Sequence, residues 1–504
     1  MRLNFGPERQ RKEDTRKQNR LLDVLGIVNV VLNTFGWSMT MAKQVMVVVM
    51  MVALMAGTAL ADPFNDAADG NWDSSNADTW GVGGVAPYDY PASGDTATID
   101  SNTVTVNIDL TGAAEPDEII LNGGTLRGAK GPLAVDADIR VQDDSNLYGG
   151  RDDNYPRPQT LMAVNGVIAD YAVGTTGRLT HTGDKYYLVL GNTNTWSGGM
   201  DITGGYVRLD AAGAAGTGGI AVSSSAANGR GVTLNLNADM ALGSTGAVTV
   251  TKNAGATQEA TLLISEPQSY GQGGNPAAPS VSIVGGTLSM YAHDVYMSFD
   301  VGSTLKFSER HDGTGAPWRV PGTFNFTDDS TLYIAGGYGS SVEMSGDLTG
   351  SSLLTVDNHA HLITLTTANP GLSGDWEFLA SSRIIADVAG AMGSGDILLT
   401  GGELEINDAA AIGPGCNLTI TGGVVEYLGG VGGTVLVSGL TLGGTPVDNG
   451  VYDIESDSFG GEDFSDYFNG TGTITVAAPS GAIPEPAGLG LLGLALLGLK
   501  RRRS

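Results

Sequence analysis

The sequence predicts an all-β protein whose body is a repetitive β-solenoid, a stack of short strands joined by tight turns. Glycine supplies 76 of the 504 residues, and charged residues make up only 16% of the chain. Abundant glycine, threonine, valine, asparagine and aspartate favour short strands and turns over helices. Hydrophobic residues reach 41% of the chain, more than a chain disordered by its composition carries.

A repeated unit of about 20 residues is the stronger evidence for a solenoid. Its pattern is two glycines, an alternating apolar segment, a spacer, Ala-Leu-Gly-x-Gly or a close variant, and a second alternating segment. Clear copies occupy 204–222, 233–250 and 401–420, and a weaker copy occupies 383–399. Alternation places the apolar side chains on one face of each strand, and glycines permit sharp corners. One unit cannot bury its apolar face alone, so successive units are expected to stack.

The fullest entry to the repeat is Asn192–Leu209, which carries a Trp-Ser-Gly-Gly sequence, and a second entry is Pro370–Trp376. These motifs resemble the autotransporter-associated β-strand repeat of bacterial surface proteins. The resemblance implies a right-handed parallel β-helix. Clear copies cover 200–250 and 383–425, so degenerate coils are expected over 255–380.

The amino-terminal end is typical of a secretory signal peptide at 41–61. Lys43 supplies a positive charge, Val45–Leu54 is apolar, and Ala59 and Ala61 are the small residues expected before a cleavage site. This pattern predicts export through a secretion translocon. The preceding residues, 1–40, are basic and polar, and we interpret them as a wrongly assigned start of the chain or as an extended leader.

The carboxyl-terminal segment, 483–504, combines a breaker, an apolar run and a basic end. Three groups of residues carry the pattern: the triplet Pro484, Glu485 and Pro486, the run Ala487–Leu499, and the cluster Lys500, Arg501, Arg502 and Arg503. The prolines set the start of a short hydrophobic helix, and the cationic end stays inside the membrane. The run is shorter than the roughly 20 residues of a stable span, which favours transient anchorage over an ordinary single-pass anchor.

This tail resembles the PEP-CTERM sorting signal. The resemblance implies recognition by an exosortase-type membrane enzyme in a diderm bacterium that makes extracellular polysaccharide. It also implies cleavage near Pro484–Pro486, followed by release or attachment at the cell surface.

Between the two ends, we expect an N-terminal β cap at 62–107, the solenoid body at 108–476 and a flexible linker at 477–482. Trp72 and Trp80 lie in the cap region. This pair has two interpretations. The tryptophans close the hydrophobic end of the body, which is the commoner role, or they stack on a sugar.

The charge of the chain restricts its partners. The formal net charge is −28, and much of the positive charge lies in the two terminal segments, so the body is strongly acidic. Such a field repels nucleic acid and anionic lipid, and argues against both as partners. Solubility outside the cell explains the acidity, and divalent-cation binding is the alternative.

Some parallel β-helices are polysaccharide lyases or glycosidases, so carboxylate pairs are candidates for catalytic groups. The candidates are Asp143–Asp144, Asp152–Asp153, Arg310–Asp312 and Asp328–Asp329. Each lies in a stretch rich in glycine, serine or asparagine that is typical of a solvated turn. We therefore assign no catalytic residue and predict that the protein is not an enzyme.

No metal or cofactor site is assigned either. His359 and His361 would share one face of a strand, but no third ligand is identifiable. Calcium is the more plausible ion, given the Asp-rich loops, and it is left without ligands. Cys416, the only cysteine, allows no intrachain disulfide and is interpreted as incidental.

The sequence thus predicts an exported, non-catalytic protein of the cell surface or extracellular matrix, with a membrane-anchored precursor. Adhesion or interaction with extracellular polysaccharide is the expected role. The alternative is a carbohydrate-active enzyme on the same β-helical scaffold.

Overall fold

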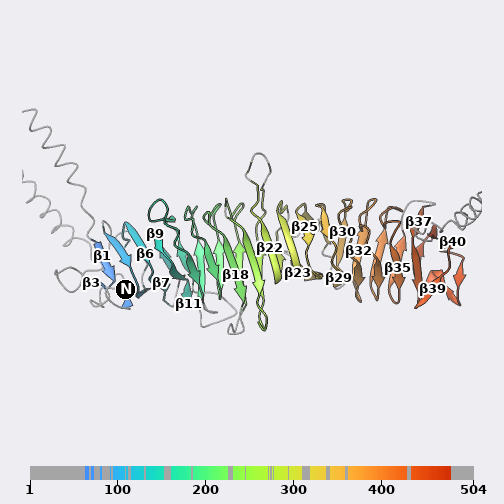
Figure 1. Ribbon diagram of the computed structural model, residues 1–504, viewed down its shortest axis with the longest axis horizontal. Helices are drawn as coiled ribbons and strands as arrows, with labels where there is room; N and C mark the ends of the chain where they lie inside the picture. Colours follow the sequence, from blue (N-terminus) through green and yellow to red (C-terminus); the bar gives the residue numbers. More distant parts are fainter. Residues whose placement is uncertain are drawn as a thin grey trace, which may run out of the picture. The chain divides into compact units, whose positions relative to one another are not determined.

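The computed structural model describes much of residues 63–477. Outside the described part lie residues 1–62 and 478–504, together with internal segments that include 152–160, 225–230, 309–317, 336–340, 358–360 and 428–432. The chain separates into two compact units, Met1–Asp62 and Pro63–Ser504, and every described strand belongs to the second. This unit is all-β with parallel sheets, as predicted (Figure 1).

The first sheet has six strands near the start of the unit. They are β1 (Pro63–Asp66), β3 (Trp80–Gly81), β4 (Thr96–Ile99), β6 (Glu118–Asn122), β9 (Asp138–Asp143) and β13 (Ile168–Asp170). The pairs β1–β4, β4–β6, β6–β9 and β9–β13 are parallel, whereas β1 pairs with β3 in the antiparallel sense. Strands of the predicted cap region therefore join the same ladder as strands of the predicted body.

The largest sheet runs through most of the unit. Its strands up to residue 264 are β2 (Gly70–Asn71), β5 (Thr103–Val106), β7 (Thr125–Gly128), β8 (Leu133–Val135), β10 (Ser145–Tyr148), β11 (Gly150–Arg151), β12 (Met162–Val164), β14 (Leu179–His181), β15 (Tyr186–Leu190), β16 (Met200–Ile202), β17 (Tyr206–Leu209), β18 (Ile220–Ser224), β19 (Val232–Leu236), β20 (Val248–Lys252) and β21 (Ala260–Ile264). Its later strands are β22 (Val281–Met290), β23 (Ser298–Ser308), β25 (Thr323–Phe326), β26 (Ser330–Ala335), β28 (Leu348–Gly350), β29 (Leu354–Asp357), β31 (Trp376–Phe378), β33 (Ile397–Leu399), β35 (Asn417–Ile420), β38 (Gly439–Leu442) and β39 (Thr445–Val447).

A third, parallel sheet occupies the later coils. It contains β24 (Trp318–Val320), β27 (Ser341–Met344), β30 (Leu362–Leu365), β32 (Arg383–Ala386), β34 (Glu403–Ile406), β36 (Val424–Tyr427) and β43 (Phe468–Gly470). Two small sheets follow, formed by β37 (Thr434–Val437), β40 (Gly450–Asp453) and β44 (Thr473–Val476), and by β41 (Ser458–Phe459) and β42 (Glu462–Asp463). A 3-10 turn, η2, covers Phe464–Asp466. In the described part of the chain, no helix has the length and apolar character needed to cross a bilayer.

Successive coils stack in register. Val207 on β17 pairs with Leu234 on β19, and Leu234 pairs with Leu262 on β21, so each strand lies beside its counterpart one coil further on. The pairings β20–β22, β22–β23, β23–β25 and β23–β26 continue this parallel order through the region with few sequence repeats. This arrangement agrees with the stacking expected of a solenoid.

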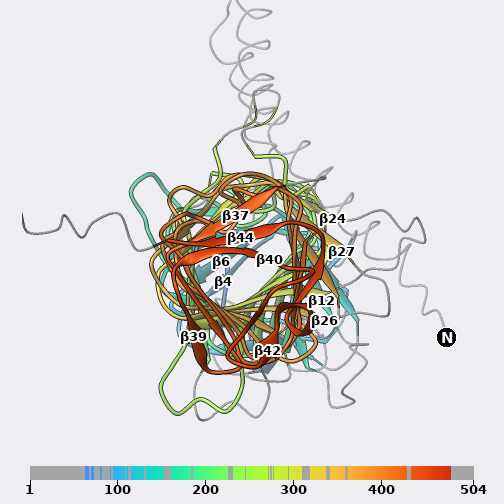
Figure 2. The same ribbon diagram turned by 90° about the vertical axis from the view of Figure 1, so that its right-hand side faces the viewer.

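The strands surround a common interior (Figure 2). One interior row, taken from successive coils, is Val104, Leu126, Leu147, His181, Ile202, Val222, Val250, Ile283 and Val301. Burial of each large aliphatic side chain contributes about 1.5–3 kcal/mol. Trp72 is fully buried in the same core, which favours its closing role over sugar stacking, whereas the side chain of Trp80 lies outside the described set.

Two coils far apart in sequence share one detailed geometry. In the earlier coil, Asn194 Oδ1 accepts from the Ile168 N–H at 2.7 Å and its amide donates to the Ala214 carbonyl at 2.6 Å. Asn369 makes the equivalent bonds, with the Leu348 N–H at 2.8 Å and the Ala391 carbonyl at 2.6 Å.

The tight corners that follow these asparagines also correspond. In the earlier coil Gly213 and Gly216 have positive φ, and in the later coil Gly390 and Gly393 have positive φ. A buried tryptophan accompanies each corner, Trp196 in the first and Trp376 in the second. The short sequence repeat therefore encodes a reproducible corner.

Candidate functional site

The predicted processing residues lie at the two ends of the chain, outside the described residues. They are Ala59 and Ala61 at the signal cleavage site, and Pro484, Glu485, Pro486, Lys500, Arg501, Arg502 and Arg503 in the tail. The candidates Asp152–Asp153, Arg310–Asp312 and His359 also lie outside the described residues. The remaining candidates can be placed.

The two described carboxylate pairs build identical corners. Asp143 Oδ1 accepts from the Asp144 N–H at 2.8 Å, and the Ser145 hydroxyl donates to the Asp143 carbonyl at 2.8 Å. In the second corner, Asp328 Oδ1 accepts from the Asp329 N–H at 2.8 Å, and a serine hydroxyl donates to the Asp328 carbonyl at 2.8 Å.

The second aspartate of each pair links its coil to the next. Asp144 Oδ1 accepts from the Arg178 N–H at 2.8 Å, and Asp329 Oδ1 accepts from the Leu353 N–H at 3.1 Å. Carboxylates that accept backbone N–H groups satisfy donors at a turn. Their geometry supports a structural role at the corners and gives no sign of an acid–base pair.

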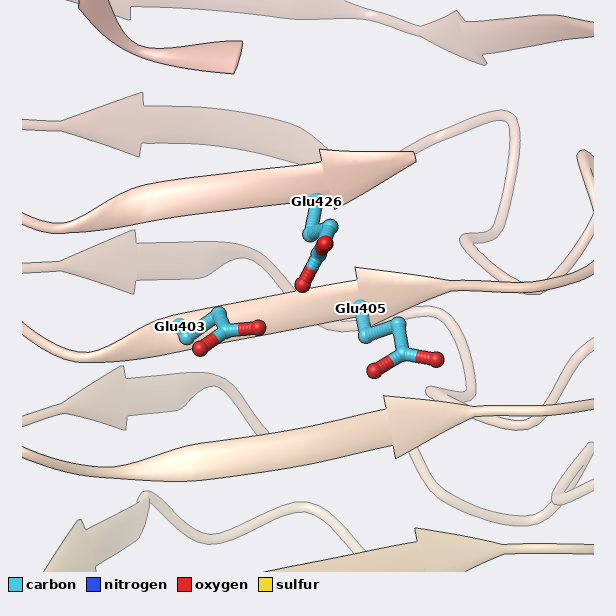
Figure 3. Close-up of side chains that lie close together, drawn as sticks. All are labelled: Glu403, Glu405 and Glu426. Atoms are coloured by element: carbon cyan, nitrogen blue, oxygen red, sulfur yellow. The ribbon is translucent and has the colours of Figure 1, made fainter. Parts of the chain in front are cut away.

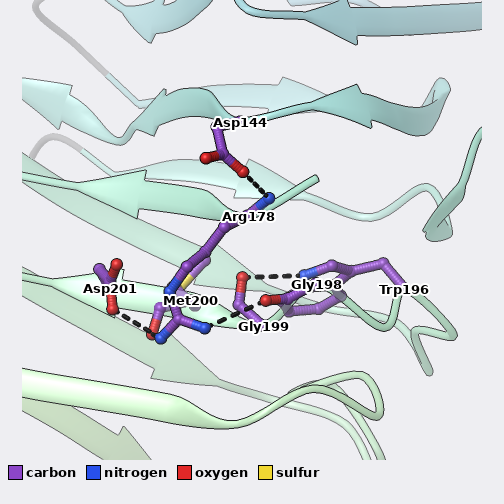
Figure 4. A network of polar contacts seen from close by, with 7 residues as sticks. All are labelled: Asp144, Arg178, Trp196, Gly198, Gly199, Met200 and Asp201. Carbon is purple, nitrogen blue, oxygen red and sulfur yellow. Dashed lines mark hydrogen bonds and ion pairs between the residues drawn. The ribbon is translucent and has the colours of Figure 1, made fainter. Parts of the chain in front are cut away.

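Arg178 is the centre of a polar network across three coils (Figure 4). Its guanidinium donates to the Gly198 carbonyl at 3.0 Å, the Met200 carbonyl at 3.2 Å and Asp201 at 2.6 Å. The hydrogen bond with Asp201 raises the pKa of Arg178 above its usual value. Because these acceptors occupy the guanidinium, the network clamps neighbouring coils and offers little to an anionic ligand.

The densest acidic group lies on the third sheet. Glu403 and Glu405 lie on β34 and Glu426 on β36, and their carboxylates approach within 4.8 Å of one another (Figure 3). Glu405 stands directly opposite Glu426 in the parallel register, an unfavourable arrangement for two like charges. Arg383 on β32 offsets it, with N–O distances of 3.3, 3.2 and 3.9 Å to Glu403, Glu405 and Glu426.

The three glutamates do not all carry a full negative charge at neutral pH. Burial and a hydrogen bond with Glu426 raise the pKa of Glu403 to about 7. Because this pKa lies close to neutral pH, the protonated form of Glu403 is populated there. Three carboxylates are donors that calcium prefers, but Arg383 already contacts all three, and we assign no metal ligand here.

Sequence reasoning missed this cluster although its signal was present. Glu403 and Glu405 alternate by two within a predicted strand, so they share a face, and Glu426 lies one repeat later. The missing information was the register, which decides whether side chains of adjacent coils meet.

Two histidines are buried within the described residues. His181 interrupts the aliphatic interior row, and burial lowers its pKa to about 4. Its ring nitrogens face the Leu147 carbonyl at 3.0 Å and the Tyr186 carbonyl at 3.4 Å. His361 is also buried, and its Nδ1 has no hydrogen-bond partner among the described residues. Neither histidine lies in a group of three metal-ligating side chains among the described residues.

Cys416 is buried, and burial raises the pKa of its thiol to about 12. A thiol with so high a pKa carries almost no thiolate at neutral pH and is a poor nucleophile. This environment agrees with an incidental, structural cysteine.

The described residues thus define a parallel, stacked all-β protein with acidic corners and no assembled catalytic group among the candidates that could be placed. The C-terminal tail indicates how the chain is sorted. The family model described as the PEP-CTERM protein-sorting motif matches residues 482–504, one residue earlier than predicted. The predicted PEP-CTERM resemblance is therefore confirmed. The motif supports an exported protein that an exosortase-type enzyme sorts.

No curated protein and no solved structure matches the chain. The family match covers the tail alone. The autotransporter-associated repeat remains a resemblance, and the function of the body rests on its own residues.

Proposed function

We propose that the protein is an exported, non-catalytic component of the cell surface or extracellular matrix, delivered by exosortase-type sorting. The observation that carries the proposal is the PEP-CTERM motif at 482–504. In this account Ala487–Leu499 anchors the precursor transiently, the chain is cut near Pro484–Pro486, and the body is presented outside the cell.

We further propose that the body is a right-handed parallel β-helix. The in-register parallel pairing of successive coils and the common buried interior support this fold. A stack of this kind offers a large, repetitive outer surface. Adhesion or interaction with extracellular polysaccharide suits such a surface better than catalysis does, because the placed carboxylate pairs serve as corner acceptors.

Replacement of the sorting triplet tests the proposal. The variant P484A/E485Q/P486A should remain in the membrane fraction of a host with an exosortase-type enzyme, while the unaltered chain reaches the surface or medium. P479A, which removes a proline outside the triplet, is the matched control and should behave as the unaltered chain. Normal surface delivery of the triplet variant would refute exosortase sorting.

The carbohydrate-active enzyme is separated by assay. The purified full-length chain should leave acidic and neutral polysaccharides intact over prolonged incubation. Release of unsaturated or reducing ends, measured against a heat-denatured control, would establish the enzymatic alternative.

A further inference from the structure

A ladder of threonines runs along the largest sheet. Six successive coils place a threonine at the same outward position, each pairing directly with the next: Thr233, Thr261, Thr287, Thr304, Thr331 and Thr355. We call this set the threonine ladder. Neighbouring strands lie about 4.8 Å apart, so six coils carry hydroxyls at regular intervals over roughly 24 Å.

The ladder is open to solvent. Each of its six side chains is partly exposed, whereas the residues on either side of it in the strand, such as Leu262 and Leu332, point inward and are buried. The hydroxyls of Thr261, Thr304 and Thr331 form no hydrogen bond within the described chain. A threonine hydroxyl donates one hydrogen bond and accepts two. The ladder therefore presents a regular row of available donors and acceptors.

The central rungs of the ladder, Thr261, Thr287 and Thr304, have few carboxylates beside them, although the chain carries a formal charge of −28. The adjacent row, two residues further along each of the first five strands, contains the buried Asn235 and Ser289 and the partly exposed Leu263, Lys306 and Tyr333. Carboxylates appear at the far end of the ladder, where Asp357 lies opposite Tyr333 and Glu377, the next residue in the ladder row, accepts from the Thr355 hydroxyl at 3.5 Å. The one carboxylate that reaches the central rungs, Glu259, lies 3.4 Å from the Thr287 hydroxyl and is paired with Lys252 at 2.5 Å.

Aromatic rings lie close to the ladder. Tyr206 precedes Thr233 in the same row, and its ring lies tilted by 34° against that of Tyr187, with centroids 5.5 Å apart. Lys306 lies over the ring of Tyr333, 5.8 Å from its centroid. Tyrosine combines an apolar face with a polar tip, which suits a ligand that alternates C–H and O–H groups.

We propose that the threonine ladder is the binding surface for an extended, neutral polysaccharide that lies along the stacking direction. The proposal rests on the proposed surface function and names the partner and the face. Regular hydroxyls match a polymer whose own hydroxyls repeat along its length, and a neutral polymer is not repelled by the carboxylates at the end of the ladder. A polyanion would meet the negative field of the rest of the chain.

The alternative explanation of the ladder is purely structural. Threonine is a good strand former, and stacked β-branched side chains stabilise neighbouring strands. Valine has the same shape and strand preference without the hydroxyl, and serine keeps the hydroxyl without the methyl group. These two substitutions separate binding from structure.

The test uses the full-length chain, purified in mild detergent, and measures its affinity for laminarin and hydroxyethyl cellulose by affinity electrophoresis. Alginate serves as the anionic probe. The ladder variant is T261V/T287V/T304V and the conservative variant is T261S/T287S/T304S. The matched control is T96V/T98V/T364V, which changes partly exposed threonines of the other two large sheets. Thermal unfolding is recorded for each.

The unaltered chain should bind at least one neutral glucan and should not bind alginate. The valine variant should bind at least tenfold more weakly with unchanged thermal unfolding, while the serine variant and the matched control keep their affinity. Absence of glucan binding by the unaltered chain, or unchanged binding by the valine variant, would overturn the proposal. Sorting of the chain to the surface is measured in a separate experiment. The proposed exosortase sorting therefore stands even if the ladder does not bind glucan.

Discussion

Two ways of turning a corner coexist in this stack. In the repeat coil around 388–394 the chain leaves one strand, makes a compact turn with Gly390 and Gly393 at positive φ, and begins another strand. In β22 the strand continues for ten residues through Val284–Thr287, where the register shifts and Gly285 takes positive φ. Both keep the next coil in parallel register. The stacking of strands, more than the repeat motif, therefore defines the fold.

The two corners differ in how closely the coils approach. A Cβ at Gly393 would lie 2.2 Å from the Leu372 carbonyl oxygen, whereas a Cβ at Gly285 would have its nearest neighbour, the Lys252 carbonyl oxygen, at 3.5 Å. The repeat corner requires glycine for both its backbone conformation and its packing. The corner within β22 requires it for conformation alone.

The largest expected effect follows from this difference. Gly393→Ala should lower the free energy of unfolding by about 2–5 kcal/mol, because strain at positive φ adds to a backbone clash. Gly285→Ala should cost only about 1–2 kcal/mol. Urea unfolding of both variants measures the contrast. Equal midpoints would show that the two corners are packed alike.

The buried asparagine of the repeat corner is the next most sensitive point. Asn369→Ala should cost about 2–4 kcal/mol, because the Leu348 N–H and the Ala391 carbonyl lose their partner inside the core. Asn194→Ala should cost a similar amount, since its bonds are equivalent. Asn325→Ala, at an exposed position, is the control and should change the urea midpoint little. An unchanged urea midpoint for Asn369→Ala would show that the buried asparagine does not stabilise the repeat corner.

A smaller effect on stability should depend on pH. It arises from the glutamate cluster in the later repeat coils. The pKa of Glu403 is raised to about 7 in the folded chain, so its protonated form is favoured by folding. The stabilisation is complete below the unfolded pKa, about 4.3, and is lost as pH rises through 7. Glu403→Gln should therefore be more stable than the unaltered chain at pH 8 and similar at pH 4.

The expected gain is on the order of 1 kcal/mol or less, because Glu403 is partly exposed and solvent screens its interactions. Thermal unfolding from pH 4 to pH 8 follows it. Glu118→Gln, which removes a carboxylate paired with Arg140 alone, is the control and should not gain stability at pH 8. A gain of the same size in both variants would contradict the role of the glutamate cluster.

Much of the stacking could be predicted from the sequence, because alternation and glycine placement are local. The first alternating segments of the repeat copies at 233–250 and 401–420 form strands β19 (Val232–Leu236) and β34 (Glu403–Ile406). Gly285 and Gly286 lie within β22, where Gly285 takes positive φ without ending the strand. The contacts that join neighbouring coils, by contrast, are made between residues far apart in the sequence. The number of residues between successive threonines of the ladder varies along the sequence. Their alignment therefore becomes visible only in the strand register.

The same limit applied to individual side chains. His181 occupies a position where neighbouring coils have Leu147 and Ile202, and no feature of its own segment predicts that row. The last part of the predicted body, 468–476, is not one continuous strand. It divides into β43 in the third sheet and β44, which pairs antiparallel with β40. Antiparallel pairing of this kind protects a sheet edge.

The central claim is that this stacked body is exported and separated from its sorting tail. Intact mass of the chain recovered from the surface or medium of an exosortase-containing host tests it most directly. The account predicts a mature chain that begins at Asp62, ends near Pro484–Pro486 and lacks the cluster Lys500–Arg503. A surface chain whose mass includes the complete tail would contradict it.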